Sequence, residues 1–117
     1  MEPLSKQNCI PCTGDAAKVT EEEMNELLKE IPQWQVKEVS QELHLERAYK
    51  FPDFQQALTF TQQVGESAEE AGHHPAILTE WGKVTVTWWT HAINGLHRND
   101  FIMASRTDNI ADQLNKN

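Results

Sequence analysis

The chain has 117 residues, of which 10 are Lys or Arg and 18 are Asp or Glu, so its formal net charge is −8. At this length, a content of 38% hydrophobic and 24% charged residues indicates one folded domain rather than a disordered chain. The acidic excess argues against nucleic acid or an anionic membrane surface as the partner, because basic faces bind both. No apolar run approaches the ~20 residues of a transmembrane helix, and no signal peptide is evident.

Residues 1–19 are expected to form a flexible leader, and residues 20–117 a single domain. Both cysteines, Cys9 and Cys12, lie in this leader with CxxC spacing. Such a pair can be a redox dithiol or half of a zinc site, but no second CxxC follows and no strand–helix context surrounds it. We therefore expect a dithiol without a catalytic role, with metal capture beside a histidine or a redox response as alternatives. The scarcity of cysteine favours a cytoplasmic location.

The first predicted helix begins at Thr20, which has capping-box spacing to Glu23, and ends at Ile31 before Pro32. Alternation predicts a short strand at residues 34–37 and a longer one at 43–51, joined as a hairpin through residues 38–41. Five side chains share one face of the longer strand, namely Leu43, Leu45, Arg47, Tyr49 and Phe51. The opposite face carries His44, Glu46, Ala48 and Lys50.

A second helix of about nineteen residues is predicted from the cap at Asp53, which has capping-box spacing to Gln56, to a stop at Gly72. Two strands follow at residues 76–81 and 84–90, and a last helix is capped by Asn99 or Asp100. The order is α-β-β-α-β-β-α, and its short connections require antiparallel pairing. We expect an α+β fold with a four-stranded antiparallel sheet and helices covering one face.

Four of the five histidines fall between positions 73 and 97. His73 and His74 precede Pro75, which restricts His74 to extended conformations, so the two rings should point in different directions. His91 leaves the end of the last predicted strand. If the two strands pair as a hairpin around Gly82 and Lys83, residues whose numbers sum to about 165 lie opposite each other. His74 and His91 have this sum, so we expect them to lie at the same end of the sheet.

Carboxylates and aromatic rings accompany these histidines. Glu69 and Glu70 end the preceding helix and Asp100 opens the following one, while Trp81 or Trp89 can provide a flat wall. Imidazoles suit proton transfer near neutral pH, and carboxylates can orient them. Taken alone, each histidine is better explained as a surface or loop residue, and the tryptophans are better explained as core residues. Taken together, the histidines with their carboxylates and aromatic rings favour a functional site.

Other chemistries find less support in the sequence. A zinc site is the rival interpretation of the histidines, but HxxxH and HExxH are absent, and adjacent histidines in extended chain rarely face one ion. We expect no metal. No GxSxG nucleophile motif and no glycine-rich phosphate loop occur either.

The segment EEAGHHPAILTEWGKVTVTWWTHAINGLHRND resembles the signature of the pterin-4a-carbinolamine dehydratase family. The signature positions are filled at the family's spacing by Glu69, His73, His74, Trp81, His91 and Asp100. Asn99 is a departure, since some members carry arginine before the acid, and Arg98 is a possible substitute. The short cysteine-bearing leader is similar to that of bacterial members.

The resemblance implies dehydration of a 4a-hydroxytetrahydropterin to quinonoid dihydropterin, in service of an aromatic amino-acid hydroxylase. It implies that His73, His74 and His91 are catalytic, that Glu69 and Asp100 orient them, and that no metal or organic cofactor takes part. Which histidine is the acid and which the base stays open. A homodimer or homotetramer is implied as well. An alternative is a protein-binding module, because some animal members also serve as dimerisation cofactors of a transcription factor.

Overall fold

The computed structural model describes residues 4–7 and 18–114. Its elements are η1 (Leu4–Lys6), α1 (Glu21–Leu28), β1 (Gln35–Val39), β2 (Glu42–Lys50), α2 (Phe54–Ala71), β3 (Ala76–Glu80), β4 (Lys83–Trp88), η2 (His91–Ile93) and α3 (Arg98–Leu114), where η denotes a 3-10 helix. The predicted order of α-helices and strands and the α+β class are confirmed. None of the helices in the described part of the chain combines the length and apolarity needed to cross a bilayer.

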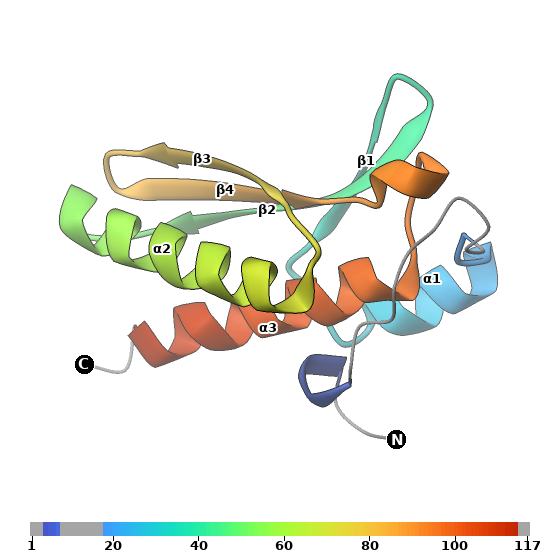
Figure 1. Cartoon of the computed structure of the whole chain (residues 1–117), viewed down its shortest axis with the longest axis horizontal. Coiled ribbons are helices and arrows are strands. Elements are labelled where there is room, and N and C mark those ends of the chain that lie inside the picture. The colour runs from blue at the N-terminus through green and yellow to red at the C-terminus, as the bar shows by residue number, and fades with distance from the viewer. Residues whose placement is uncertain (1–3, 8–17, 115–117) are drawn as a thin grey trace.

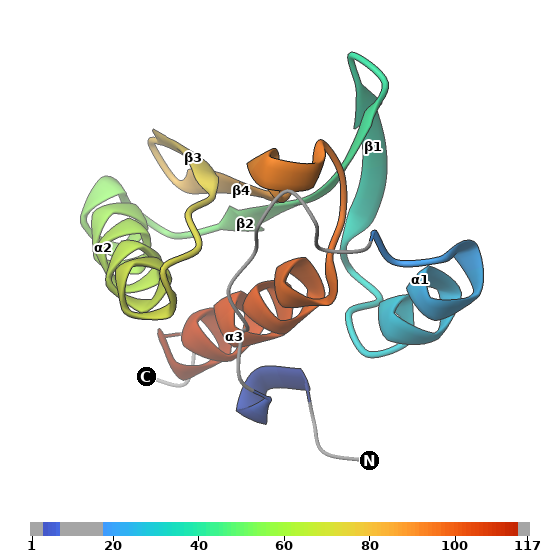
Figure 2. The ribbon, with the colours of Figure 1, turned by 45° about the vertical axis from the view of Figure 1, so that its right-hand side comes forward.

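The four strands form one antiparallel sheet in the order β1-β2-β4-β3. Helices α2 and α3 lie against one face of this sheet, as predicted (Figure 1, Figure 2). Alternate side chains of the two central strands are buried, namely Leu45 and Tyr49 on β2 and Val84, Val86 and Trp88 on β4. Because successive side chains of a strand point to opposite faces, these residues form the layer between the sheet and the helices.

The β1–β2 hairpin is tighter than predicted. Val39 pairs with Glu42, which leaves Ser40 and Gln41 as a two-residue turn with φ of 51° and 70°. Positive φ at both central residues characterises the type I′ turn, whose twist matches that of paired strands. Asn-Gly is the usual signal for this turn, so Ser-Gln did not indicate it, and β1 extends beyond the predicted end at residue 37.

Helix α1 has the predicted start and an earlier end. The Thr20 hydroxyl oxygen accepts from the Glu23 amide at 3.1 Å, and the Glu23 carboxylate accepts from the Thr20 amide at 3.3 Å. The helix ends at Leu28 rather than at Ile31, because the residue before Pro32 is disfavoured in helical conformation. Ile31 nevertheless reaches the core and is fully buried.

Asp108 on α3 links that helix to the sheet. Its Oδ1 accepts hydrogen bonds from Trp34 Nε1 at 2.9 Å, from Arg47 Nη1 at 2.6 Å and from the Tyr49 hydroxyl. The Arg47 guanidinium also lies 4.3 Å from the centre of the Tyr49 ring. Burial, reinforced by the Asp108 charge, raises the pKa of Tyr49 above its ordinary value, so Tyr49 serves as a neutral donor.

Residues 4–7 belong to the predicted leader. Leu4 is fully buried, and η1 lies against α3 (Figure 1). The Arg98 guanidinium donates to the Gln7 side chain at 2.8 Å, and Arg106 Nη2 donates to the Gln7 carbonyl at 2.6 Å. The predicted dithiol at positions 9 and 12 lies outside the described residues, so its role stays a prediction.

Candidate active site

The histidine pair follows directly from the way α2 ends. Gly72 has φ of 66°, a left-handed conformation that glycine adopts without steric cost. Its amide donates to the Glu69 carbonyl at 3.2 Å, and the His73 amide donates to the Ala68 carbonyl at 3.1 Å. These two bonds form a Schellman motif, which reverses the chain and delivers His73 and His74 at a defined point beside the sheet.

His73 is held in the interior of the molecule. Its side chain is 11% exposed, and its Nε2 lies 2.6 Å from Oδ1 of Asp100, whose side chain is wholly buried. A carboxylate only accepts, so His73 donates from Nε2. The His73 ring also stacks on Trp88, with centroids 5.4 Å apart and planes at 23°. The ring is therefore held at its edge by Asp100 and at its face by Trp88. Its other nitrogen, Nδ1, makes no hydrogen bond to Asp100.

Asp100 binds two further groups of the chain. Its Oδ2 accepts from the Thr90 hydroxyl at 2.8 Å and from the His97 amide at 2.9 Å, while His97 Nδ1 accepts from the Asn99 amide at 3.0 Å. His97 is therefore the N-cap of α3, with its side chain accepting from the amide of the second helical residue and its own amide bound by Asp100. The predicted cap at Asn99 or Asp100 is therefore wrong, and α3 begins one residue after His97. Asp100 holds His73 through Oδ1 and accepts from the His97 amide through Oδ2, so it supports the helix start without being its cap.

His97 is buried beside this carboxylate. Desolvation lowers the pKa of His97 below its ordinary value, although the Asp100 charge acts in the opposite direction. A lowered pKa is consistent with the hydrogen bond, because Nδ1 can accept from the Asn99 amide only while it carries no proton. The i, i+3 spacing of His97 and Asp100 was the signal that could have placed the helix start.

The second imidazole–carboxylate pair lies at the surface. His74 Nε2 lies 3.2 Å from Oε1 of Glu69, and the two side chains are 63% and 83% exposed. An exposed pair of this kind contributes little to stability. It does place a titratable ring in contact with water, next to the enclosed His73. As predicted, the adjacent rings turn to different partners.

The β3–β4 register differs by two residues from the prediction. The prediction placed His74 opposite His91 by taking Gly82 and Lys83 as the turn. In the structure Glu80 pairs with Lys83, so residues 81 and 82 form the turn, with Gly82 at φ of 68°. Extending this register puts residue 89, not 91, opposite His74. Both histidines still lie at the same end of the hairpin, before β3 and after β4.

His91 is exposed and begins η2. Its ring lies against Trp89, with centroids 4.6 Å apart and planes at 57°. Trp89 in turn stacks on His44 of β2, at 4.1 Å and 14°. His44 was not among the predicted site residues, since it is a lone histidine on the strand face opposite the apolar set. Only the pairing of β2 with β4 brings it there.

Trp81 lies apart from the histidines within the chain. It is 74% exposed in the β3–β4 turn, at the opposite end of that hairpin from His73 and His91. Trp89 is the tryptophan beside His91. A contact between Trp81 and substrate stays a prediction.

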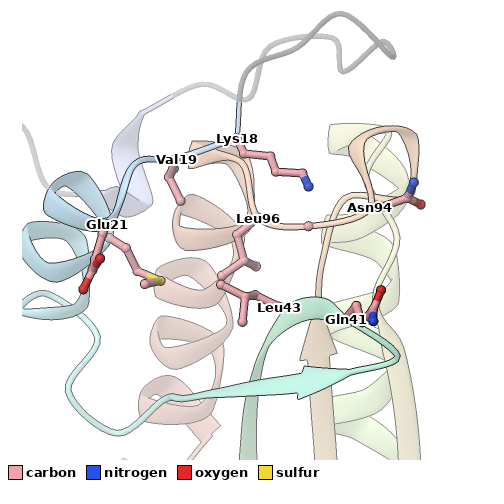
Figure 3. A pocket seen from close by; sticks show the side chains of 9 residues that line it. Lys18, Val19, Glu21, Gln41, Leu43, Asn94 and Leu96 are labelled. Atoms are coloured by element: carbon pink, nitrogen blue, oxygen red, sulfur yellow. The ribbon is translucent and has the colours of Figure 1, made fainter.

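A pocket of about 420 Å³ lies between the start of α1, the β1–β2 turn and the segment that joins η2 to α3 (Figure 3). Leu43 and Leu96 form part of its apolar lining, while Lys18, Gln41 and Asn94 supply polar groups. No predicted site residue lines this pocket. Proton transfer needs titratable groups within reach of the substrate, so the histidine–carboxylate pairs are the stronger candidate site than this pocket.

The two pairs differ in a chemically useful way. The buried Asp100 carboxylate accepts from Nε2 of His73 and so fixes the orientation of an enclosed ring, while the His74–Glu69 pair lies in contact with water. An arrangement of this kind can deliver a proton at one atom of a substrate and remove one at another. No three His, Cys, Asp or Glu side chains within residues 4–7 and 18–114 are arranged to hold a metal ion.

Two comparisons with known proteins show the family of the chain. Residues 17–110 match the family model described as pterin 4 alpha carbinolamine dehydratase, a range that contains every predicted site residue. Among solved structures, the chain is similar to the crystal structure of a transcriptional coactivator/pterin dehydratase from Brucella melitensis. The TM-score is 0.73 and the sequence identity 37%, over 81% of this chain and 99% of the other.

Proposed function

The chain belongs to the pterin-4a-carbinolamine dehydratase family, and on that premise we propose that it converts a 4a-hydroxytetrahydropterin into quinonoid dihydropterin and water. The observation that carries the proposal is the bond between His73 and the buried Asp100, beside the exposed pair of His74 and Glu69. An enclosed imidazole and a solvated one suit a reaction with two proton transfers.

The chemistry defines what the residues must do. The C4a–O bond breaks and the hydroxyl leaves as water, so the oxygen gains a proton; a ring nitrogen loses one as the C=N bond forms. Of His73, His74 and His91, one donates and another accepts, with Glu69 and Asp100 acting through the rings they bind. The reaction is redox-neutral, and the proposal includes neither a metal nor an organic cofactor.

The direct test is to add the protein to an aromatic amino-acid hydroxylase reaction and to follow the absorbance of the 4a-carbinolamine. We expect the carbinolamine to disappear faster with the protein than without it. A Glu26→Gln variant, altered at an exposed side chain of α1, is the control and should behave like the unmodified protein. Decay at the uncatalysed rate with the unmodified protein would refute the proposal.

The family membership also supports a homodimer or homotetramer acting in the cytoplasm beside a hydroxylase. Exposed apolar side chains on the sheet and its turns, Val39, Leu78 and Trp81, are consistent with self-association. Trp81 lies about 17 Å along the hairpin from the histidine end, given ~3.3 Å per strand residue, so it could contact the same pterin only from a second copy. Light scattering after gel filtration measures the oligomeric state.

A second function, as a protein-binding module, is favoured by one observation. Phe54 and Leu58 lie one turn apart on α2, and both are exposed. The similar protein from Brucella melitensis is described as a coactivator as well as a dehydratase. Quenching of tryptophan fluorescence by a pterin analogue would support the enzyme, whereas a pure adaptor should show no quenching. A Phe54→Ser/Leu58→Ser variant should lose protein association and keep pterin binding.

A further inference from the structure

We propose that the first residues of β2, Glu42 and His44, position His91 for catalysis. The proposal rests on the proposed function, because it assigns His91 a part in the dehydration. Glu42 and His44 lie far from His91 in sequence, and the antiparallel pairing of β2 with β4 brings them together. In Figure 1 the β1–β2 hairpin extends at the same side of the molecule as η2.

His91 differs from the other two predicted catalytic histidines in how its ring is held. His73 and His74 each bind a carboxylate. Within the described part of the chain, the His91 ring forms no hydrogen bond or ion pair, and its neighbour is the ring of Trp89. The orientation of an exposed imidazole then depends on ring packing and on the backbone that carries it.

The ring packing is supported from β2. His44 lies almost parallel to Trp89, with centroids 4.1 Å apart, and is 7% exposed. Its Nε2 is shielded from water without a hydrogen-bond partner in the described residues, and the nearest carboxylate oxygen, on Glu42, is 3.9 Å away. Since this nitrogen makes no hydrogen bond, the contribution of His44 is its stacked face, which confines Trp89 and through it His91.

The backbone of His91 is anchored to the same stretch. The side-chain amide of Asn94 is oriented so that its nitrogen faces acceptors. In this orientation Nδ2 donates to the His91 carbonyl at 3.2 Å and to Glu42 Oε2 at 3.1 Å. Asn94 also ends η2 in a left-handed conformation, with φ of 51°. Glu42 thus holds the turn that carries His91, while His44 supports the ring.

The test compares His44→Ala with His44→Phe, which keeps an aromatic face and removes the nitrogens. The position of the His91 ring is read from the NMR shift of its Cε1 proton, which the Trp89 ring current displaces; a His91→Gln spectrum assigns the signal. We expect His44→Ala to move this signal toward that of a free histidine and to lower kcat about 10-fold, with KM changed less. His44→Phe should leave both close to the values of the unmodified protein.

The matched control is Glu38→Ala, a truncation of an exposed side chain on the same hairpin, which should change neither readout. Because His44 acts through Trp89, adding His44→Ala to Trp89→Ala should lower kcat no further than Trp89→Ala alone. If His44→Ala does not fold, His44→Leu takes its place, since leucine fills the space without an aromatic face.

Two results would overturn the inference: an unchanged His91 signal and kcat in His44→Ala, or a His44→Phe variant as impaired as His44→Ala. The NMR readout does not depend on the reaction. If the unmodified protein failed to dehydrate the carbinolamine, the proposed function would fall, while the shift of His91 would still decide whether His44 positions it.

Discussion

His73 donates from Nε2 to Oδ1 of Asp100 across 2.6 Å, and the accepting carboxylate is wholly enclosed by protein. The two residues belong to different elements, since His73 follows α2 and Asp100 lies in the first turn of α3. The Thr90 hydroxyl and the His97 amide occupy the other carboxylate oxygen. Three donors to one carboxylate hold it in a single orientation, and that orientation passes to the His73 ring.

The first prediction concerns the charge of this carboxylate. In Asp100→Asn, an amide oxygen can still accept from Thr90 and from the His97 amide, but the amide nitrogen then faces His73 Nε2 and favours the other tautomer. We expect kcat for carbinolamine dehydration to fall about 10²-fold or more, the usual scale for acid–base catalysis. The matched control is Asp112→Asn on the exposed side of α3, which should keep full activity. An Asp100→Asn protein that folds and turns over normally would contradict the assignment.

The second prediction concerns the exposed pair. His74→Ala should lower kcat about 10²-fold or more without unfolding the protein, because a ring that is 63% exposed contributes little packing. Thermal denaturation followed by circular dichroism should give an unchanged Tm. Glu69→Gln should have a smaller effect on kcat, since water can replace an exposed hydrogen bond. Normal turnover in a folded His74→Ala variant would remove His74 from the catalytic set.

The third prediction concerns stability alone. Asp108→Ala removes the shared acceptor of Trp34, Arg47 and Tyr49, and leaves partly buried donors without a partner. We expect the free energy of unfolding to fall by about 2–4 kcal/mol, measured by urea denaturation. Glu26→Ala, which breaks an exposed pair with Lys29 on α1, should change it by less than about 0.5 kcal/mol. Equal effects of the two substitutions would show that the Asp108 cluster adds nothing beyond a surface ion pair.

The fourth prediction concerns pH. Burial lowers the pKa of His97 in the folded protein, whereas the unfolded chain keeps the ordinary pKa of about 6.5. Between the folded and the unfolded pKa, the unfolded chain therefore binds more protons than the folded protein. The contribution of His97 is therefore complete above about pH 6.5 and is lost as the pH falls below it. His97→Asn keeps an acceptor for the helix cap and removes the titration. We expect its Tm to decline less than that of the unmodified protein between about pH 7 and pH 5. Parallel declines of the two proteins would contradict this prediction.

Much of the fold followed from signals that involve neighbouring residues. The capping residues Thr20 and Asp53 and the left-handed Gly72 act on amides and carbonyls a few positions away, so their roles could be predicted without tertiary information. Where a local signal was atypical, the prediction was wrong. Ser40 and Gln41 form a turn that Asn-Gly usually marks, and His97 caps a helix where serine, threonine or aspartate is more usual.

Part of the candidate site could likewise be predicted from the sequence, and part of it could not. The spacing of the histidines along the predicted strands was enough to place these groups near one end of a hairpin. Their partners depend on tertiary contacts: Asp100 for His73, and Trp89 with the distant His44 for His91. Those contacts depend on the strand register and on how α3 docks against the sheet. A shift of one residue in the β3–β4 turn, with the left-handed Gly82 as its second residue, was enough to change the pairing by two residues and so the residue opposite His74.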